Sequence, residues 1–70
     1  MTTAMIIVLN GLEHAAPVGA SVLALLETLG FAPGRVAVEV NGRILRREDF
    51  VRAILRDSDR VEVVQFVGGG

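Results

Sequence analysis

The chain has 70 residues and a formal net charge of −1, with no cysteine, tyrosine or tryptophan and a single histidine. This length suffices for one small domain with a thin core and leaves little room for the deep cleft of an independent enzyme. The lack of cysteine rules out a disulfide, a thiolate metal site and a nucleophilic thiol, and His14 alone builds neither a metal site nor a catalytic triad. A near-neutral chain without large aromatic platforms also argues against nucleic-acid binding.

The longest apolar run, Ala4 to Leu9, is too short to cross a membrane. It follows two threonines and no basic residue, unlike the start of a secretory signal peptide. We therefore expect a soluble, cytoplasmic protein that does not associate with membranes.

The N-terminal region predicts a β-hairpin. Met5 to Leu9 is apolar and rich in β-branched residues, and Asn10-Gly11 is typical of a two-residue turn with positive φ. A second strand, Leu12 to about Ala16, should pair with the first and end at Pro17, which has no N–H to donate. His14 then shares a face with the two leucines that flank the turn. We expect it to be half-buried or at an edge, with no ligand role.

The next segment, Ser21 to Leu29, predicts a short amphipathic helix. Ser21 is a favourable N-cap, and Gly30 supplies the left-handed residue that commonly follows a helix. The apolar residues between them recur at helical spacing, at Val22, Leu25, Leu26 and Leu29. A helix this short needs a surface to pack against.

That surface is a sheet built from the remaining strands. Val36 to Val40 alternates with period two and meets a second turn dipeptide, Asn41-Gly42, after which Arg43 to Leu45 predicts a short returning strand.

The last third of the chain predicts one more strand. The stretch 47–55 has weak helical character, typical of a single turn or a 3₁₀ segment, and Asp57-Ser58-Asp59 predicts a turn. Arg60 to Val67 then predicts a final strand that leads into Gly68-Gly69-Gly70.

The order of these elements predicts an α+β fold with a mixed sheet of about five strands and one main helix across one face. The first and last strands should lie side by side in the middle. This is the β-grasp, or ubiquitin-like, arrangement. We expect a single β-grasp domain over residues 1–67 and a flexible glycine tail over residues 68–70.

The tail is the segment best suited to chemistry. Glycine allows close approach and unusual backbone angles, so Gly68 and Gly69 would let the chain enter a narrow channel. The carboxylate of Gly70 is ionised at neutral pH and is nucleophilic without a catalytic base. Its attack on the α-phosphate of ATP would give an acyl-adenylate. Because cysteine is absent, sulfur carried by this chain would have to reside on that carboxylate.

Three residues before the tail suggest a docking surface. If Val61 and Val63 face the helix, then Val64 and Phe66 face solvent on the far side of the sheet, with Val67 beside them. Apolar side chains next to a tail that must enter the channel of an enzyme favour contact with a protein partner. The alternative is that they are ordinary exposed apolar residues, or that Phe66 folds into the core.

Charged residues give weaker signals. Glu39 would lie on the same far face, where a solvated role is favoured. The arginine cluster Arg43, Arg46 and Arg47 lies next to Glu48 and Asp49, which favours a solvated face over a partner contact.

Taken together, these residues resemble the ThiS family, the sulfur carrier proteins of thiamine biosynthesis. The resemblance covers nearly the whole chain, and its most specific parts are the segment Val36-Ala37-Val38-Glu39-Val40-Asn41-Gly42 and the end Val67-Gly68-Gly69-Gly70. It implies a carrier that is not itself an enzyme and binds no cofactor or metal.

The resemblance also implies partners. An E1-like enzyme would adenylate Gly70 with ATP and magnesium, a sulfur donor protein would convert the adenylate to a thiocarboxylate, and thiazole synthase would take the sulfur to form thiazole. The free chain would be a monomer.

Four alternatives remain open at this stage. The chain fits a carrier for molybdopterin or for another sulfur pathway. It also fits a plain β-grasp interaction module with an inert tail, or a modifier that is conjugated to lysines of other proteins. The chain itself contains no lysine.

Overall fold

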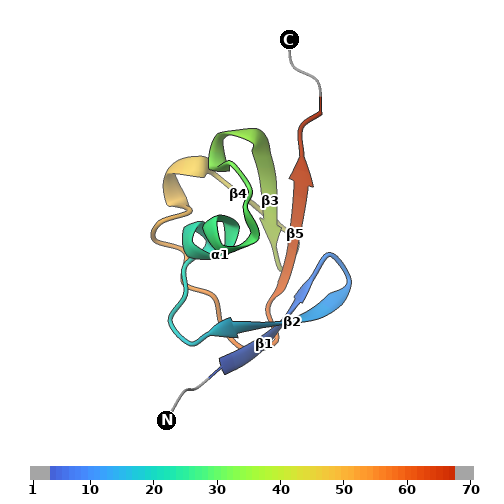
Figure 1. Ribbon diagram of the computed structural model, residues 1–70, viewed down its shortest axis with the longest axis vertical. Helices are drawn as coiled ribbons and strands as arrows, with labels where there is room; N and C mark the ends of the chain where they lie inside the picture. Colours follow the sequence, from blue (N-terminus) through green and yellow to red (C-terminus); the bar gives the residue numbers. More distant parts are fainter. Residues whose placement is uncertain (1–3, 68–70) are drawn as a thin grey trace.

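The computed structural model of the protein describes residues 4–67. Figure 1 shows a helix beside a twisted sheet, with the C-terminal strand running toward one end of the molecule. The elements in chain order are β1 (Ala4–Leu9), β2 (Leu12–Pro17), α1 (Val22–Leu29), the 3₁₀ turn η1 (Pro33–Arg35), β3 (Val36–Val40), β4 (Arg43–Leu45), the 3₁₀ turn η2 (Arg47–Asp49) and β5 (Arg60–Gln65).

The five strands form one mixed sheet in the order β2-β1-β5-β3-β4. The central pair, β1 and β5, is parallel, and the other neighbouring pairs are antiparallel. This confirms the predicted β-grasp arrangement, including the first and last strands side by side. The N-terminal hairpin has the expected two-residue turn, because Leu9 is opposite Leu12.

Helix α1 begins and ends where its sequence signals place it. The Oγ of Ser21 accepts a hydrogen bond from the backbone N–H of Ala24 at 3.0 Å, and Gly30 has a φ of 82°. The Gly30 N–H donates to the carbonyl of Glu27, which satisfies one of the carbonyl groups that a helix end leaves free.

The loop after η2 completes the first turn of α1. The N–H of Val22 donates to the carbonyl of Ala53 at 2.9 Å, and the N–H of Leu23 donates to that of Phe50 at 3.0 Å. These bonds occupy donors that have no partner within the helix. The 3₁₀ turn at Arg47–Asp49 confirms the single turn or 3₁₀ segment predicted within residues 47–55, and the rest of this loop packs against the start of α1.

The core lies between α1 and the inner face of the sheet. Strands β1, β3 and β5 contribute alternate residues, as period two requires, and the loop adds Phe50 and Leu55. The buried residues are Met5, Ile7, Ala16, Val22, Leu25, Leu26, Val36, Val38, Phe50, Leu55, Val61 and Val63.

Two strand ends differ slightly from the prediction. Strand β2 continues through Pro17, and β5 ends at Gln65 rather than Val67. The end of β5 follows from its neighbour, because β3 begins at Val36, opposite Gln65. One further bond, from the Phe66 N–H to the Arg35 carbonyl at 2.8 Å, extends the contact past the strand.

Both Asn-Gly turns also hold β5, a role that the turn motif itself does not predict. Asn10 and Asn41 have φ values of 49° and 51°. The side-chain amide of Asn10 accepts a hydrogen bond from the Val63 N–H at 2.8 Å and donates to the Val63 carbonyl at 3.2 Å. The Oδ1 of Asn41 accepts from the Arg60 N–H at 2.8 Å. Strand β5 is thus fixed at its start and in its middle.

Replacing Asn10 with glycine should lower the free energy of unfolding by about 1–2 kcal/mol more than the added backbone freedom alone would. The reason is that glycine keeps the positive φ but loses two partly buried hydrogen bonds. The matched control is Asn41→Gly, whose side-chain bonds are exposed. Urea denaturation should give a clearly larger loss for Asn10→Gly. Equal losses would show that the Asn10 amide does not hold β5.

Candidate partner-docking site at the end of β5

The face of the sheet turned away from α1, here called the outer face, carries exposed apolar side chains near the end of β5. Val64 is 60% exposed and Phe66 is 58% exposed, whereas Val61 and Val63 are buried on the helix side. The predicted register of β5 is therefore correct, and Phe66 does not fold into the core. Val67, next along the chain, is 94% exposed.

A shallow groove crosses the outer face beside these residues. It has a volume of about 140 Å³ and is lined by Ala37, Val38, Glu39, Ile44, Glu62 and Val64. A second hollow, beside His14 between β2 and α1, has a volume of about 60 Å³. Both are smaller than the several hundred Å³ typical of small-molecule sites, so the outer groove is better suited to side chains of a protein partner.

Ile44 is a docking candidate that sequence reasoning missed. It is 79% exposed and lies opposite Glu39 in the β3–β4 pair, so its side chain is on the outer face. The two-residue turn at Asn41-Gly42 already implies this pairing, because Val40 must then lie opposite Arg43. The signal was therefore present in the sequence.

Two carboxylates lie within the apolar surroundings of the groove. Glu39 is half-buried and lies directly opposite the exposed Glu62 across β3 and β5. Like charges in such a cross-strand pair repel one another. A partner that contacts this groove would therefore gain from a cationic group placed between the two glutamates.

Replacing Glu62 with glutamine should stabilise the free domain by a few tenths of a kcal/mol, because it removes the repulsion without changing the shape of the side chain. The gain should shrink as the salt concentration rises and the charges are screened. Unfolding free energies measured at low and high salt test this. A loss of stability at low salt would contradict it.

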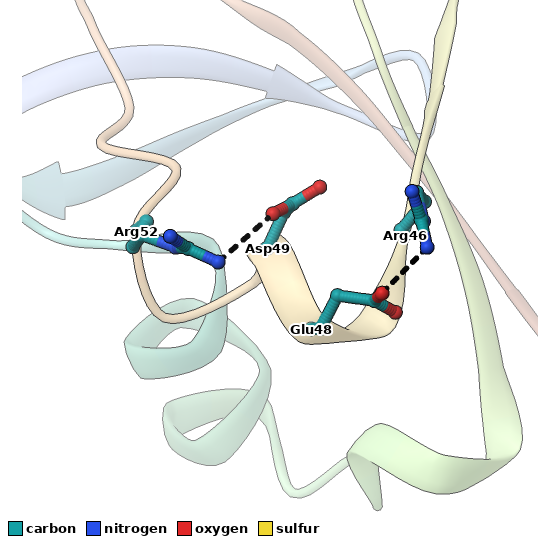
Figure 2. Close-up of polar contacts among 4 residues, drawn as sticks. All are labelled: Arg46, Glu48, Asp49 and Arg52. Carbon is teal, nitrogen blue, oxygen red and sulfur yellow. Dashed lines mark hydrogen bonds and ion pairs between the residues drawn. The ribbon is translucent and has the colours of Figure 1, made fainter.

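The arginine cluster has acidic neighbours, as its sequence suggested. Figure 2 shows two ion pairs around η2, one between Arg46 and Glu48 at 2.6 Å and one between Arg52 and Asp49 at 3.5 Å. Arg43, Arg46 and Arg47 are all exposed. Ion pairs on an open surface contribute little to stability, so these charges are solvated in the free domain, and the preference for a solvated face over a partner contact stays a prediction.

Other chemistry is sparse in the part of the chain that the structure describes. Within residues 4–67, no three histidine, aspartate or glutamate side chains gather as metal ligands would. None of the helices in this range has the length and apolar character needed to span a membrane. His14 is half-buried on the edge strand β2, as expected. The tail, Gly68 to Gly70, lies outside the described residues.

Comparison with known proteins agrees with this arrangement. Residues 6–70 match the sequence pattern of the ThiS family. The chain belongs to the ThiS family. Its match to the family includes β5 and the segment that follows it, where the candidate docking residues lie.

Solved structures show the same fold in a ThiS protein. The chain resembles the crystal structure of the thiamine biosynthesis protein (ThiS) from Geobacter metallireducens with a TM-score of 0.81 and 36% identity, covering 94% of this chain and 100% of that one. The mixed five-stranded sheet with one helix is thus the ThiS β-grasp fold.

Longer relatives carry a similar sequence as one part of their length. The chain is 46% identical over 62 residues to a thiazole synthase of Magnetococcus marinus, covering 89% of this chain and 19% of that protein. It is 38% identical over 66 residues to a thiazole synthase of Paramagnetospirillum magneticum, covering 94% of this chain and 20% of that protein. The chain therefore spans about a fifth of the length of these relatives.

Proposed function

We propose that this protein is a sulfur carrier of thiamine biosynthesis that acts through the terminal carboxylate of Gly70. The observation that carries the proposal is membership of the ThiS family over residues 6–70, a range that includes the glycine tail. The domain itself holds the tail and provides the surface that partner enzymes recognise. Its grooves, which are smaller than typical small-molecule sites, agree with this role. It is a protein substrate for other enzymes and holds no cofactor of its own.

The proposed chemistry has two successive steps at the carboxylate of Gly70. A carboxylate oxygen of Gly70 attacks the α-phosphate of ATP, and the bond to pyrophosphate breaks to give an acyl-adenylate. Hydrosulfide, released from a persulfide on a donor protein by a thiol reductant, then attacks the carbonyl carbon of Gly70. The bond from that carbon to the AMP oxygen breaks, AMP leaves, and the S–H proton is lost to solvent. The product is a thiocarboxylate. Magnesium and ATP belong to the E1-like activating enzyme, and Gly68 and Gly69 provide steric clearance in its channel.

The proposed acceptor of the sulfur is thiazole synthase. About a fifth of each of two proteins named thiazole synthase matches this chain, so a ThiS-like sequence and that enzyme share one polypeptide there. Sequences that are fused in some organisms commonly act together when they are separate. This observation favours the thiamine pathway over a carrier for molybdopterin or another sulfur metabolite.

A labelled-sulfur transfer assay tests this assignment. The protein is loaded with radiolabelled sulfide, ATP, magnesium and its cognate activating enzyme, and then mixed with thiazole synthase and its other substrates. We expect the label to move into the thiazole product. ThiS from Geobacter metallireducens serves as the control carrier. If the control transfers its label and this protein, once loaded, retains it, the thiamine assignment is wrong.

The same assay addresses the alternative of a β-grasp interaction module with an inert tail. Such a protein would bind partners through the outer face but would never acquire label. A conjugated modifier would instead appear as a covalent adduct on lysines of other proteins, because its adenylate would be opened by an amine.

A further inference from the structure

The backbone N–H and carbonyl groups of β5 form hydrogen bonds alternately toward its two neighbouring strands, β3 and β1. The Arg60 carbonyl accepts from the Asn41 N–H, and the Phe66 N–H donates to the Arg35 carbonyl, so the even-numbered residues of this stretch bond on the β3 side. The odd-numbered residues bond on the β1 side. The Val8 N–H donates to the Asp59 carbonyl and the Asn10 N–H donates to the Val61 carbonyl, each at 2.9 Å.

On the β1 side this pattern ends early. The parallel pairing of β1 with β5 reaches only to Leu9 and Val61, because the chain then enters the Asn10-Gly11 turn. The side-chain amide of Asn10 occupies the next pairing position. It accepts from the Val63 N–H and donates to the Val63 carbonyl, as a peptide group of a longer β1 would. Figure 1 shows the β1–β2 hairpin beside the lower part of β5, while β5 continues past it toward the C-terminus.

The next odd-numbered residue is Gln65. By the same alternation its N–H and carbonyl point to the β1 side, where no described residue of β1 or β2 is paired with it. Gln65 is exposed, and so are Phe66 and Val67 after it. Among residues 4–67, strand β5 and the two residues after it therefore have a short open edge, which begins beyond the Asn10 amide and runs to Val67.

We propose that this edge accepts an extended segment of the activating enzyme, which adds to the sheet in line with β1 and bonds to the backbone of Gln65. Unpaired strand edges are templates for such additions. The added segment would lie beside Val64 and Phe66 on the outer face, so its side chains on that face should be apolar. The pairing would fix the direction in which the tail leaves the domain.

The occupant follows from the position of the edge. The open stretch directly precedes the glycines in the sequence, so a partner that binds the tail is brought next to this edge, and the activating enzyme is the first such partner in the proposed reaction sequence. This inference rests on the proposed function for the identity of the partner.

Amide hydrogen exchange measured by NMR tests the proposal directly. In the free protein we expect the Gln65 N–H to exchange about as fast as an amide in an unstructured peptide, and the Val63 N–H, held by Asn10, to be protected. Binding of the activating enzyme without ATP should slow exchange at Gln65 at least about tenfold. Slow exchange in the free protein, or unchanged exchange in a saturated complex, would overturn the proposal.

A pair of variants gives an independent readout. Gln65→Pro removes the N–H on the open edge and leaves the bonds to β3 in place, a position where a strand tolerates proline. Gln65→Ala removes only the side chain. We expect Gln65→Pro to raise the Kd for the activating enzyme at least about tenfold, and Gln65→Ala to change it less than about twofold. Equal effects would contradict the proposal, and urea denaturation checks that both variants fold.

The proposed function and this inference fail in different ways. If the wild-type chain binds the activating enzyme but is never adenylated, the carrier function is wrong. If the wild-type chain is adenylated while Gln65 gains no protection and Gln65→Pro binds normally, only the strand-addition proposal is wrong.

Discussion

A chain shortened to end at Gly68 should accept no detectable adenylate, although its terminal residue is still a glycine with a free carboxylate. Two residues of extended chain span roughly 7 Å, so the shortened carboxylate cannot reach the α-phosphate if the domain docks in its normal position. A misplacement of only 1 Å can cost on the order of a hundredfold in rate. We therefore expect loading to fall by well over a hundredfold, measured by ATP–pyrophosphate exchange.

The fold provides the control for this truncation. Within residues 4–67, every buried residue lies between Met5 and Val63, so the shortened chain should unfold at the same urea concentration as the full chain. A second control keeps all residues and replaces the terminal carboxylate of Gly70 with a carboxamide, which removes the nucleophile alone. Normal loading of either protein would contradict the role assigned to Gly70.

Replacing Val64 with aspartate should weaken binding of the activating enzyme by about 2 kcal/mol, a factor of roughly 30 in Kd. The new carboxylate would be buried at the contact without a partner, next to Glu62 on the same face of the same strand. Stability should change by less than about 1 kcal/mol, because Val64 is 60% exposed in the free domain. Titration calorimetry gives the affinity, and urea denaturation gives the stability.

The matched control for Val64→Asp is Val51→Asp. Val51 is 59% exposed and lies in the loop after η2, outside the outer face, so the same charge is added at a similar exposure. We expect its affinity to stay within about twofold of the wild type. If both variants lose affinity equally, the effect is one of net charge. If Val64→Asp binds normally, the outer face is not the docking surface.

Much of the fold could be predicted because its signals are local. The Asn10-Gly11 and Asn41-Gly42 turns define two hairpins, Ser21 and Gly30 delimit the helix, and period-two alternation assigns the faces of β5. Each signal involves residues that are close in sequence, so no knowledge of tertiary contacts was needed. The resulting register placed Val64 and Phe66 on the outer face correctly.

Apart from Ile44, whose place follows from a local turn, the features that sequence reasoning missed depend on contacts between distant segments. The bond between the Asn10 amide and Val63 joins residues that are 53 positions apart, and the turn motif gives no hint of it. The loop after η2 adopts its path because its carbonyls accept hydrogen bonds from the first turn of α1, a contact that the local pattern of residues 47–55 does not reveal. The open edge at Gln65 likewise follows from where β1 ends beside β5.

The most direct test of the carrier function is the intact mass of the chain during activation. The protein is incubated with ATP, magnesium, a sulfur donor and its cognate activating enzyme, and then fragmented to locate any change. We predict a transient adenylate adduct, followed by replacement of one oxygen by sulfur on Gly70 and on no other residue. An unchanged mass in the presence of an enzyme that adenylates a control ThiS, or a change on any residue other than Gly70, would contradict the proposed function.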